Sequence, residues 1–185
     1  MNAPLETKPD GVSPSGPLPA QGRQVRSTGL IFAAIVFFAD QILKWVMIGP
    51  LGLQERGQIE IVSVFNFTWV QNFGVSLGML TADTHMGRWL LVALTGAIAA
   101  GVLVWLWRET NRGEALALGA ILGGALGNIL DRMRLGYVVD FADLHFGDWR
   151  PFLVFNLADA AITLGVVVLL ARAFFGGAKK EVIDA

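Results

Sequence analysis

Four long apolar runs alternate with more polar connections along the chain, and each run is long enough to cross a membrane. About 20 helical residues span the roughly 30 Å hydrocarbon core of a bilayer. The pattern predicts four membrane-spanning helices, over Gly29–Ile48, Trp89–Trp107, about Ala115–Arg132 and Phe152–Ala171. A soluble fold would need four almost entirely apolar helices in a chain of 185 residues. We therefore favour a membrane protein built as a four-helix bundle.

The connections on one side of the bundle have a different pattern. Gln58–Val70 is rich in β-branched and aromatic residues, which predicts one or two strands. Gly136–Ala142 predicts another short strand in the same sheet, and Val75–His85 predicts a short interfacial helix. The expected fold class is an all-α membrane protein whose four-transmembrane-helix bundle carries a small β-sheet and a short interfacial helix on its outer side.

The two ends of the chain are polar tails. Five of the seven prolines fall within residues 1–28, a stretch that cannot bury enough apolar surface to order itself. We expect a disordered cytoplasmic tail over 1–28, a membrane domain over 29–175 and a second cytoplasmic tail over 176–185. Residues 1–28 do not resemble a signal peptide, because the first apolar run follows a long polar lead.

The distribution of lysine and arginine predicts the orientation of the spans. Basic residues flank both termini and fill the short connection between the second and third spans: Arg23, Arg26, Arg108, Arg112, Arg172, Lys179 and Lys180. Both termini and this connection are therefore expected in the cytoplasm. The bias is modest, since four arginines fall on the other side: Arg56, Arg88, Arg134 and Arg150.

Composition agrees with a membrane protein and narrows its chemistry. The chain is 54% hydrophobic with a mean hydropathy of +0.57, and its net charge of -1 gives no sign of nucleic-acid binding. The absence of cysteine excludes disulfides, thiol catalysis and cysteine-based zinc sites. The two histidines lie far apart in the sequence, so we expect no metal site and no cofactor, although carboxylates alone can bind a hard cation.

Polar residues gather at the outer ends of the spans once the helices are folded up and down. At 1.5 Å per residue, Asp40 and Asp159 reach similar depths, roughly 10–12 Å below the outer boundary. Asp140 lies just before the fourth span and can fold back over its mouth. Helical spacing of three or four residues places several polar residues on shared faces: Asp40 with Lys44, Asn128 with Asp131 and Arg132, and Asn156 with Asp159.

Two carboxylates in this group, Asp140 and Asp159, have no obvious structural role. A charge at the bilayer centre costs on the order of 3 kcal/mol on insertion scales, so unused charges are rare. Asp40 and Lys44 are as consistent with a simple intrahelical ion pair as with a functional role, and Asp131 is best explained as a helix-end anchor at the headgroups. Asp159 has no basic residue within one turn, and the topology brings Asp140 to it.

Two carboxylates held close in a water-poor site share one proton. One then acts as the base that activates water, and the other acts as the acid. This is aspartic-protease chemistry, which needs neither serine nor metal.

Other patterns compete with this interpretation. The stretch "GVSLG" (Gly74–Gly78) matches a nucleophile elbow, but that elbow requires a strand, a turn and a helix together with a histidine and an acid. A Ser76–Lys44 dyad stays open as an alternative, and so does a small transporter or proton channel, although polar groups clustered on one side argue against a pathway. Glycines that recur every four residues predict close helix packing: Gly119, Gly123 and Gly127.

Five motifs then appear in a recognisable order: "DQILKW", "NFGVSLG", "GGALGNILDR", "GYVVDF" and "FNLADAAITLG". Their order and spacing resemble lipoprotein signal peptidase, also called signal peptidase II, over about Gly29 to Ala171. Only the long proline-rich N-terminal tail departs from the family's compact form. The resemblance implies a bacterial inner-membrane aspartic endopeptidase whose active site lies at the periplasmic face. Its substrate would be a prolipoprotein that carries diacylglycerol on a cysteine, cut just before that cysteine.

The resemblance also implies roles for individual residues. The family's catalytic aspartates fall on Asp140 and Asp159. Its further substrate-binding or site-orienting positions fall on Asp40, Asn72, Asn128, Arg132 and Asn156, and we add Lys44 to this group. The expected partners are the lipid-modified prolipoprotein, membrane lipids and an inhibitor of the globomycin type, with the protein acting as a monomer.

Overall fold

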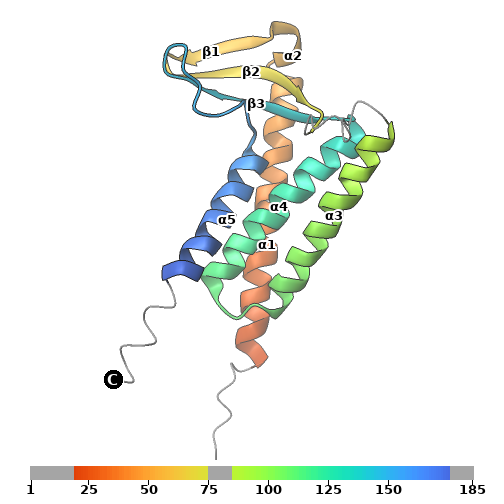
Figure 1. The fold of residues 1–185 in the computed structure, drawn as a ribbon, viewed down its shortest axis with the longest axis vertical. Helices are drawn as coiled ribbons and strands as arrows, with labels where there is room; N and C mark the ends of the chain where they lie inside the picture. The colour runs from red at the N-terminus through yellow and green to blue at the C-terminus, as the bar shows by residue number, and fades with distance from the viewer. Residues whose placement is uncertain (1–18, 75–84, 176–185) are drawn as a thin grey trace, which may run out of the picture.

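The computed structural model describes residues 19–74 and 85–175, and it consists of a helical bundle with a small sheet over one end (Figure 1). Four helices in this part of the chain are long and apolar enough to cross a membrane. They are α1 (Pro19–Ile48), α3 (His85–Arg108), α4 (Arg112–Arg134) and α5 (Leu157–Phe175). The prediction of four membrane-spanning helices is therefore confirmed.

The starts of two helices differ most from the sequence-based expectation. Helix α1 already begins at Pro19, so the prediction of disorder is wrong for residues 19–28, because Val25 packs into the bundle core. Helix α5 begins at Leu157, five residues later than expected. The backbone of Phe155 instead exchanges hydrogen bonds with Ala142 in a β-bridge, which draws the preceding segment toward the sheet.

The sheet has three antiparallel strands in the order β1 (Gln58–Val62), β2 (Phe65–Asn72) and β3 (Val138–Leu144). This confirms both predicted strand regions and their union in one sheet. A one-turn helix, α2 (Leu53–Arg56), connects α1 to β1 and was not expected. The predicted interfacial helix at Val75–His85 lies outside the described residues except for His85, which begins α3.

Helix α4 lies at the centre of the bundle because small residues let its neighbours approach closely. A side chain at Gly119 or Gly123 would collide with a backbone carbonyl of α1, and one at Gly124 would collide with the carbonyl of Ala158 in α5. The expected glycine packing is thus confirmed. In the most apolar 18-residue stretch of α4, 56% of the residues are buried inside the protein. The corresponding fraction is 11% for both α3 and α5.

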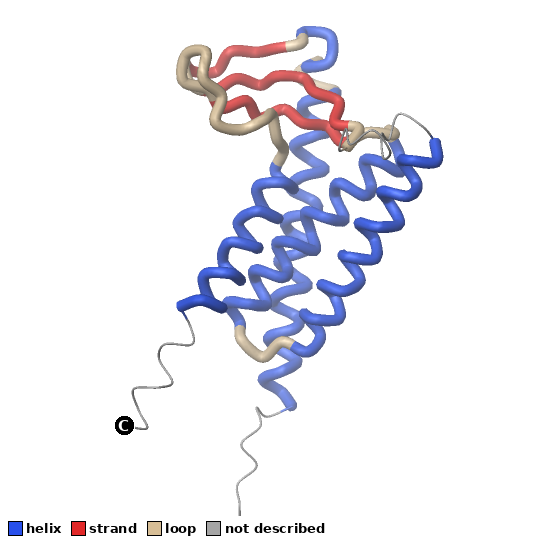
Figure 2. Tube along the Cα trace, in the orientation of Figure 1, coloured by secondary structure: helices blue, strands red, loops and turns tan. Residues whose placement is uncertain are grey.

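A second hydrophobic core fixes the sheet on the outer end of the bundle. Met47 at the end of α1 and Leu53 in α2 pack with Phe141 and Ala142 of β3. Strand β3 is consequently buried along most of its length, and it crosses above the ends of the helices (Figure 2). This arrangement holds the middle of β3 directly over the start of α5.

Candidate active site

Asp140 and Asp159 approach each other from different elements of the fold. Asp140 lies in the middle of β3, and Asp159 is the third residue of α5. Asn156 links them: its side-chain Nδ2 donates to Asp140 Oδ1 at 2.6 Å, and its backbone N–H donates to Asp159 Oδ2 at 3.2 Å. Burial and the nearby charge of Asp159 raise the pKa of the Asp140 carboxyl to about 6.

The position of Asp159 follows from the way α5 begins. Asn156 caps the helix, because its Oδ1 accepts the backbone N–H of Asp159 at 2.9 Å, while the Asp159 carboxylate accepts the N–H of Asn156. This reciprocal pair is a capping box. Asp159 therefore lies in the first turn and not seven residues into the span, and the positive end of the helix dipole stabilises a negative charge there.

Asn72 presents its amide nitrogen to the other aspartate for a similar local reason. The N–H of Gly74 donates to Asn72 Oδ1 at 2.9 Å, so the Nδ2 group faces Asp140 and donates to Oδ2 at 3.0 Å. Gly74 has a φ of +103°, a backbone conformation that favours glycine. The motif "NFG" therefore sets the direction of this hydrogen bond.

Asn128 is oriented by a charge. Lys44 Nζ donates to Asn128 Oδ1 at 3.2 Å, and an ammonium group has no acceptor, so the oxygen of the amide must face the lysine. Its Nδ2 then donates to Asp159 Oδ1 at 2.8 Å. Three asparagines thus direct amide N–H groups at the two carboxyls, each with its own oxygen held by another donor.

A buried ion cluster lies beneath this layer. The ammonium of Lys44 is only 3% exposed and contacts Asp40 at 2.8 Å and Asp131 at 2.7 Å. The intrahelical pair of Asp40 with Lys44 is thus present. The expected headgroup anchor at Asp131 is wrong, because this side chain is buried in the cluster.

The same cluster holds the backbone next to each candidate catalytic aspartate. Asp40 Oδ1 accepts the N–H of Ala158 at 3.0 Å, and Asp131 Oδ2 accepts the N–H of Val139 at 3.3 Å. Ala158 directly precedes Asp159, and Val139 directly precedes Asp140. The ion cluster therefore fixes the backbone immediately before both aspartates.

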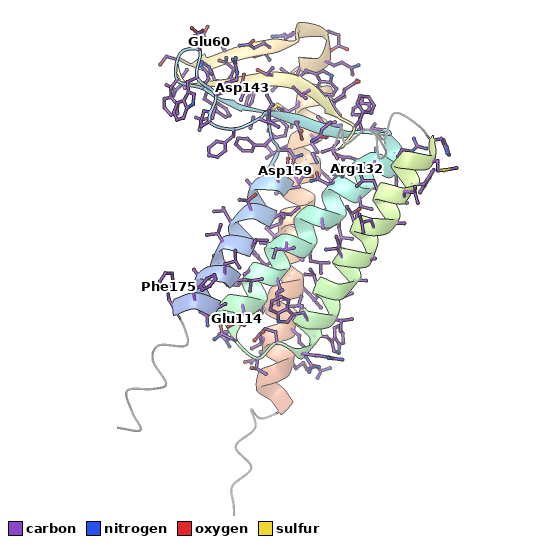
Figure 3. The ribbon with its side chains drawn as sticks, viewed as in Figure 1. Glu60, Glu114, Arg132, Asp143, Asp159 and Phe175 are labelled. Atoms are coloured by element: carbon purple, nitrogen blue, oxygen red, sulfur yellow. The ribbon has the colours of Figure 1, made fainter. Side chains whose placement is uncertain are left out.

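Arg132 lies at the same outer end of the bundle as Asp159, below the sheet (Figure 3). Its Nη1 donates to the backbone oxygen of Asn128 at 3.4 Å, and its charge interacts with those of Asp140 and Asp159. Its buried Nε has no hydrogen-bond partner in the part of the chain that the structure describes. A polar group of a bound substrate can supply that partner.

Sequence reasoning did not identify every residue of the site. Gln41 donates to Asp40 at 3.2 Å and to Asp131 at 3.0 Å, although it had not been expected there. The spacing of Asn156 and Asp159 is the capping-box signal, and it marks the start of α5 in the sequence. No comparable local signal marks Gln41, because its contact with Asp131 reaches across 90 residues of chain.

A further buried aspartate, Asp143, does not belong to the pair. Asp143 is buried in the sheet, where Thr68 donates to it at 3.0 Å and Arg150 at 3.1 Å, so its role is structural. Ser76 lies outside the described residues. The Lys44 ammonium is already engaged by Asp40, Asp131 and Asn128.

Comparison with known proteins bears on this arrangement. The family described as signal peptidase (SPase) II matches residues 32–175. The chain belongs to the signal peptidase II family. A lipoprotein signal peptidase of Sphingopyxis alaskensis is 57% identical over 157 residues, covering 85% of this chain and 91% of the relative. One of Rhizorhabdus wittichii is 59% identical over 148 residues, covering 80% and 86%.

Two solved structures of bacterial membrane enzymes share this fold. One bacterial membrane enzyme aligns with a TM-score of 0.69 at 25% identity, covering 84% of this chain and 92% of its own. A second aligns with a TM-score of 0.68 at 26% identity, covering 80% and 92%. As a member of the signal peptidase II family, the protein is a multi-pass membrane protease of the aspartic type that removes signal peptides from lipid-modified prolipoproteins.

Proposed function

We propose that Asp140 and Asp159 are the catalytic pair with which this protein cuts a prolipoprotein just before its lipid-bearing cysteine. One observation carries the proposal: a single residue, Asn156, donates hydrogen bonds to both carboxyls at the outer mouth of the bundle. A peptide bond held above Asn156 would lie within reach of both groups.

The surroundings of the two carboxyls support different roles for them. Asp140 is buried in a strand, and its pKa of about 6 favours the protonated form in slightly acidic solution. Asp159 lies at a helix N-terminus and accepts two N–H groups, which stabilise its negative charge. Asp159 is therefore the base and Asp140 is the acid.

The reaction then needs only the pair and one water molecule. Asp159 takes a proton from the water as its oxygen attacks the scissile carbonyl carbon, and Asp140 gives its proton to the carbonyl oxygen. In the second step the C–N bond breaks, Asp159 gives its proton to the leaving nitrogen, and a hydroxyl of the intermediate returns a proton to Asp140. Both carboxyls end in their starting states.

Arg132 and the asparagines would position the substrate and the water. The free Nε of Arg132 is suited to a substrate carbonyl. Asn72 and Asn128 each spend one amide hydrogen on an aspartate, which leaves the second for peptide backbone or water. Every group in this mechanism comes from a single chain, which supports action as a monomer.

The location of the site supports an outward-facing enzyme in the inner membrane. The basic residues near both ends of the chain favour cytoplasmic termini, so the sheet and the aspartates would face the periplasm. Asp159 lies in the first turn of a spanning helix, close to the depth at which a lipid-anchored peptide bond would be held. A globomycin-type inhibitor would occupy the same position between the aspartates.

Cleavage of a synthetic lipidated prolipoprotein peptide by the purified full-length protein tests the proposal. Asp140→Asn and Asp159→Asn should each lower kcat by about 10²–10⁴-fold, because each removes one proton-transfer group. Asp148→Asn removes an exposed carboxyl outside the pair and serves as the matched control. Globomycin should inhibit the wild type. A folded Asp140→Asn or Asp159→Asn that retains turnover would refute the pair.

A further inference from the structure

A groove of about 400 Å³ opens beside Asp159 on the exposed side of α5. The segment between the sheet and the helix supplies one wall, from Phe152, Leu153 and Phe155. Helix α5 supplies the other wall, from Ala160, Thr163 and Leu164. We call these six residues the acyl groove, for the reason argued below. Leu153 is 91% exposed and Leu164 is 65% exposed, so the groove is open to its surroundings.

The groove leads from the candidate catalytic site into the membrane. Asp159 and Thr163 are one turn apart on α5, and Leu164 lies about 8 Å further along the axis than Asp159 at 1.5 Å per residue. Because α5 runs from the sheet into the bundle, that direction points toward the hydrocarbon. One end of the groove is therefore polar and the rest lies in lipid.

The lining selects an apolar and slender occupant. Apart from the Asp159 carboxylate and the Thr163 hydroxyl, the described walls present only aliphatic and aromatic side chains. One turn of a helix with its side chains, 10–12 Å across and 5.4 Å high, fills roughly 400–600 Å³. The groove can therefore enclose no more than a single turn of a signal-peptide helix, whereas an extended hydrocarbon chain fits along it.

We propose that the acyl groove binds one acyl chain of the lipid carried by the substrate cysteine. The inference rests on the proposed function, in which Asp159 activates the water that attacks the bond before this cysteine. Neighbouring Cα atoms in a peptide are about 3.8 Å apart, so the lipid-bearing side chain must begin next to the attacked carbonyl. The signal peptide continues on the other side of that bond, away from the lipid-bearing side chain.

A bulky substitution inside the groove, with a matched one outside it, tests the proposal. Thr163→Trp fills the groove from an exposed position, and Val167→Trp places the same side chain one turn further along, at a position that is 54% exposed and outside the groove. The substrates are two lipopeptides with the same sequence, one with long and one with short acyl chains. The readouts are KM and kcat for the purified full-length protein in detergent.

Thr163→Trp should raise KM for the long-chain lipopeptide by about tenfold or more, because it displaces buried methylenes. Its KM for the short-chain lipopeptide should change much less, and Val167→Trp should match the wild type on both. Wild-type values for Thr163→Trp on the long-chain substrate would overturn the proposal. An equal increase in KM for both chain lengths would also overturn it, since it would indicate contact with the peptide.

Crosslinking keeps the acyl groove testable without turnover. A lipopeptide with a photoreactive group on one acyl chain, bound to Asp159→Asn, should label the segment 152–164, and a group on the signal peptide should label other segments. The reverse pattern would overturn the acyl assignment. If the wild type cleaves neither lipopeptide, the proposed function fails, and the crosslinking result still decides the occupant of the groove.

Discussion

Two pairs of aspartates lie close together at the outer end of the bundle, and they differ in what separates them. Between Asp40 and Asp131 lies the ammonium of Lys44, at 2.8 and 2.7 Å. Between Asp140 and Asp159 lies Asn156, a neutral residue that donates one hydrogen bond to each. We call Asp40 and Asp131 the lower pair and Asp140 and Asp159 the upper pair. A cation bridges the lower pair, whereas a neutral side chain bridges the upper pair.

This difference explains how one pair of carboxylates can have a structural role while the other pair has the proposed role in proton transfer. A lysine between two aspartates offsets their repulsion, and the lower pair anchors the backbone before Asp140 and Asp159. An asparagine satisfies hydrogen bonds but adds no charge, so the upper pair is left to share a proton. Among the described residues, no cation forms an ion pair with the two carboxyls of this layer, and Arg132 interacts with them only through its charge.

Removing the cation from the lower pair should have the largest effect on stability. Lys44→Met leaves two buried carboxylates without compensation, which costs about 3–5 kcal/mol. Arg172→Met breaks the exposed pair with Glu114 and should cost at most about 1 kcal/mol. Thermal unfolding in detergent compares the two variants. Equal unfolding temperatures would show that the lower cluster is not a structural anchor.

Removing the Asp140 carboxyl from the upper pair should change stability in the opposite direction. Burial and the nearby Asp159 raise the pKa of folded Asp140 to about 6, above the ordinary aspartate value of about 4, so folding takes up a proton between these pH values. Stability from this group is present below about pH 4 and is lost as the pH rises to about 6. At pH 7, Asp140→Asn should therefore be more stable than the wild type, by on the order of 3 kcal/mol.

Unfolding at pH 4 provides the control for that comparison: Asp140 is then protonated in the folded state and only about half ionised in the unfolded state, so the advantage of Asp140→Asn should shrink. The cleavage rate of the wild type should fall as the pH rises above about 6, since the acid loses its proton. An advantage of Asp140→Asn that is equal at pH 4 and pH 7 would contradict a raised pKa.

A single methyl group added at Gly127 tests how tightly the lower pair is packed. A Cβ at Gly127 would lie 2.7 Å from Asp40 Oδ2 and would push this carboxylate away from Lys44. Gly127→Ala should cost about 1–3 kcal/mol. Gly96→Ala lies in the interior of α3 with nothing within 4 Å of the added atom, and should stabilise the helix by about 0.5–1 kcal/mol. If the unfolding temperatures of Gly127→Ala and Gly96→Ala move in the same direction, the tight packing of Gly127 against Asp40 is contradicted.

The smallest effect is expected for Ser76, the alternative nucleophile. Ser76→Ala should leave kcat within about twofold of the wild type, because neither proposed proton transfer uses a hydroxyl. The assay is the same lipopeptide cleavage. An inactive but folded Ser76→Ala would revive the serine–lysine alternative and remove the need for the upper pair.

The upper pair was easier to predict from sequence than the lower one. Local patterns identified the spans, the strand regions and both Asp140 and Asp159, because apolar periodicity and up-and-down topology bring β3 over α5. The start of α5 was placed too early, since the apolar residues before Asn156 extend the helical pattern while their backbone pairs with β3.

The burial of Asp131 could not be read from its own helix. Its position near the end of α4 is equally typical of a headgroup anchor, and its partners Gln41 and Lys44 come from a helix almost 90 residues earlier. The orientation of each asparagine side-chain amide also depends on contacts between helices and strands. The chemistry of the site was thus predictable by residue type, whereas its hydrogen-bond directions required the fold.

Infrared spectroscopy of the protonated carboxyl tests the central claim most directly. At pH 5 the wild type should show a protonated carboxylic acid that disappears as the pH rises through about 6, and that is missing from Asp140→Asn but present in Asp148→Asn. If Asp140→Asn keeps this signal, or if the wild-type signal disappears near the ordinary aspartate pKa of about 4, the two aspartates do not share a proton.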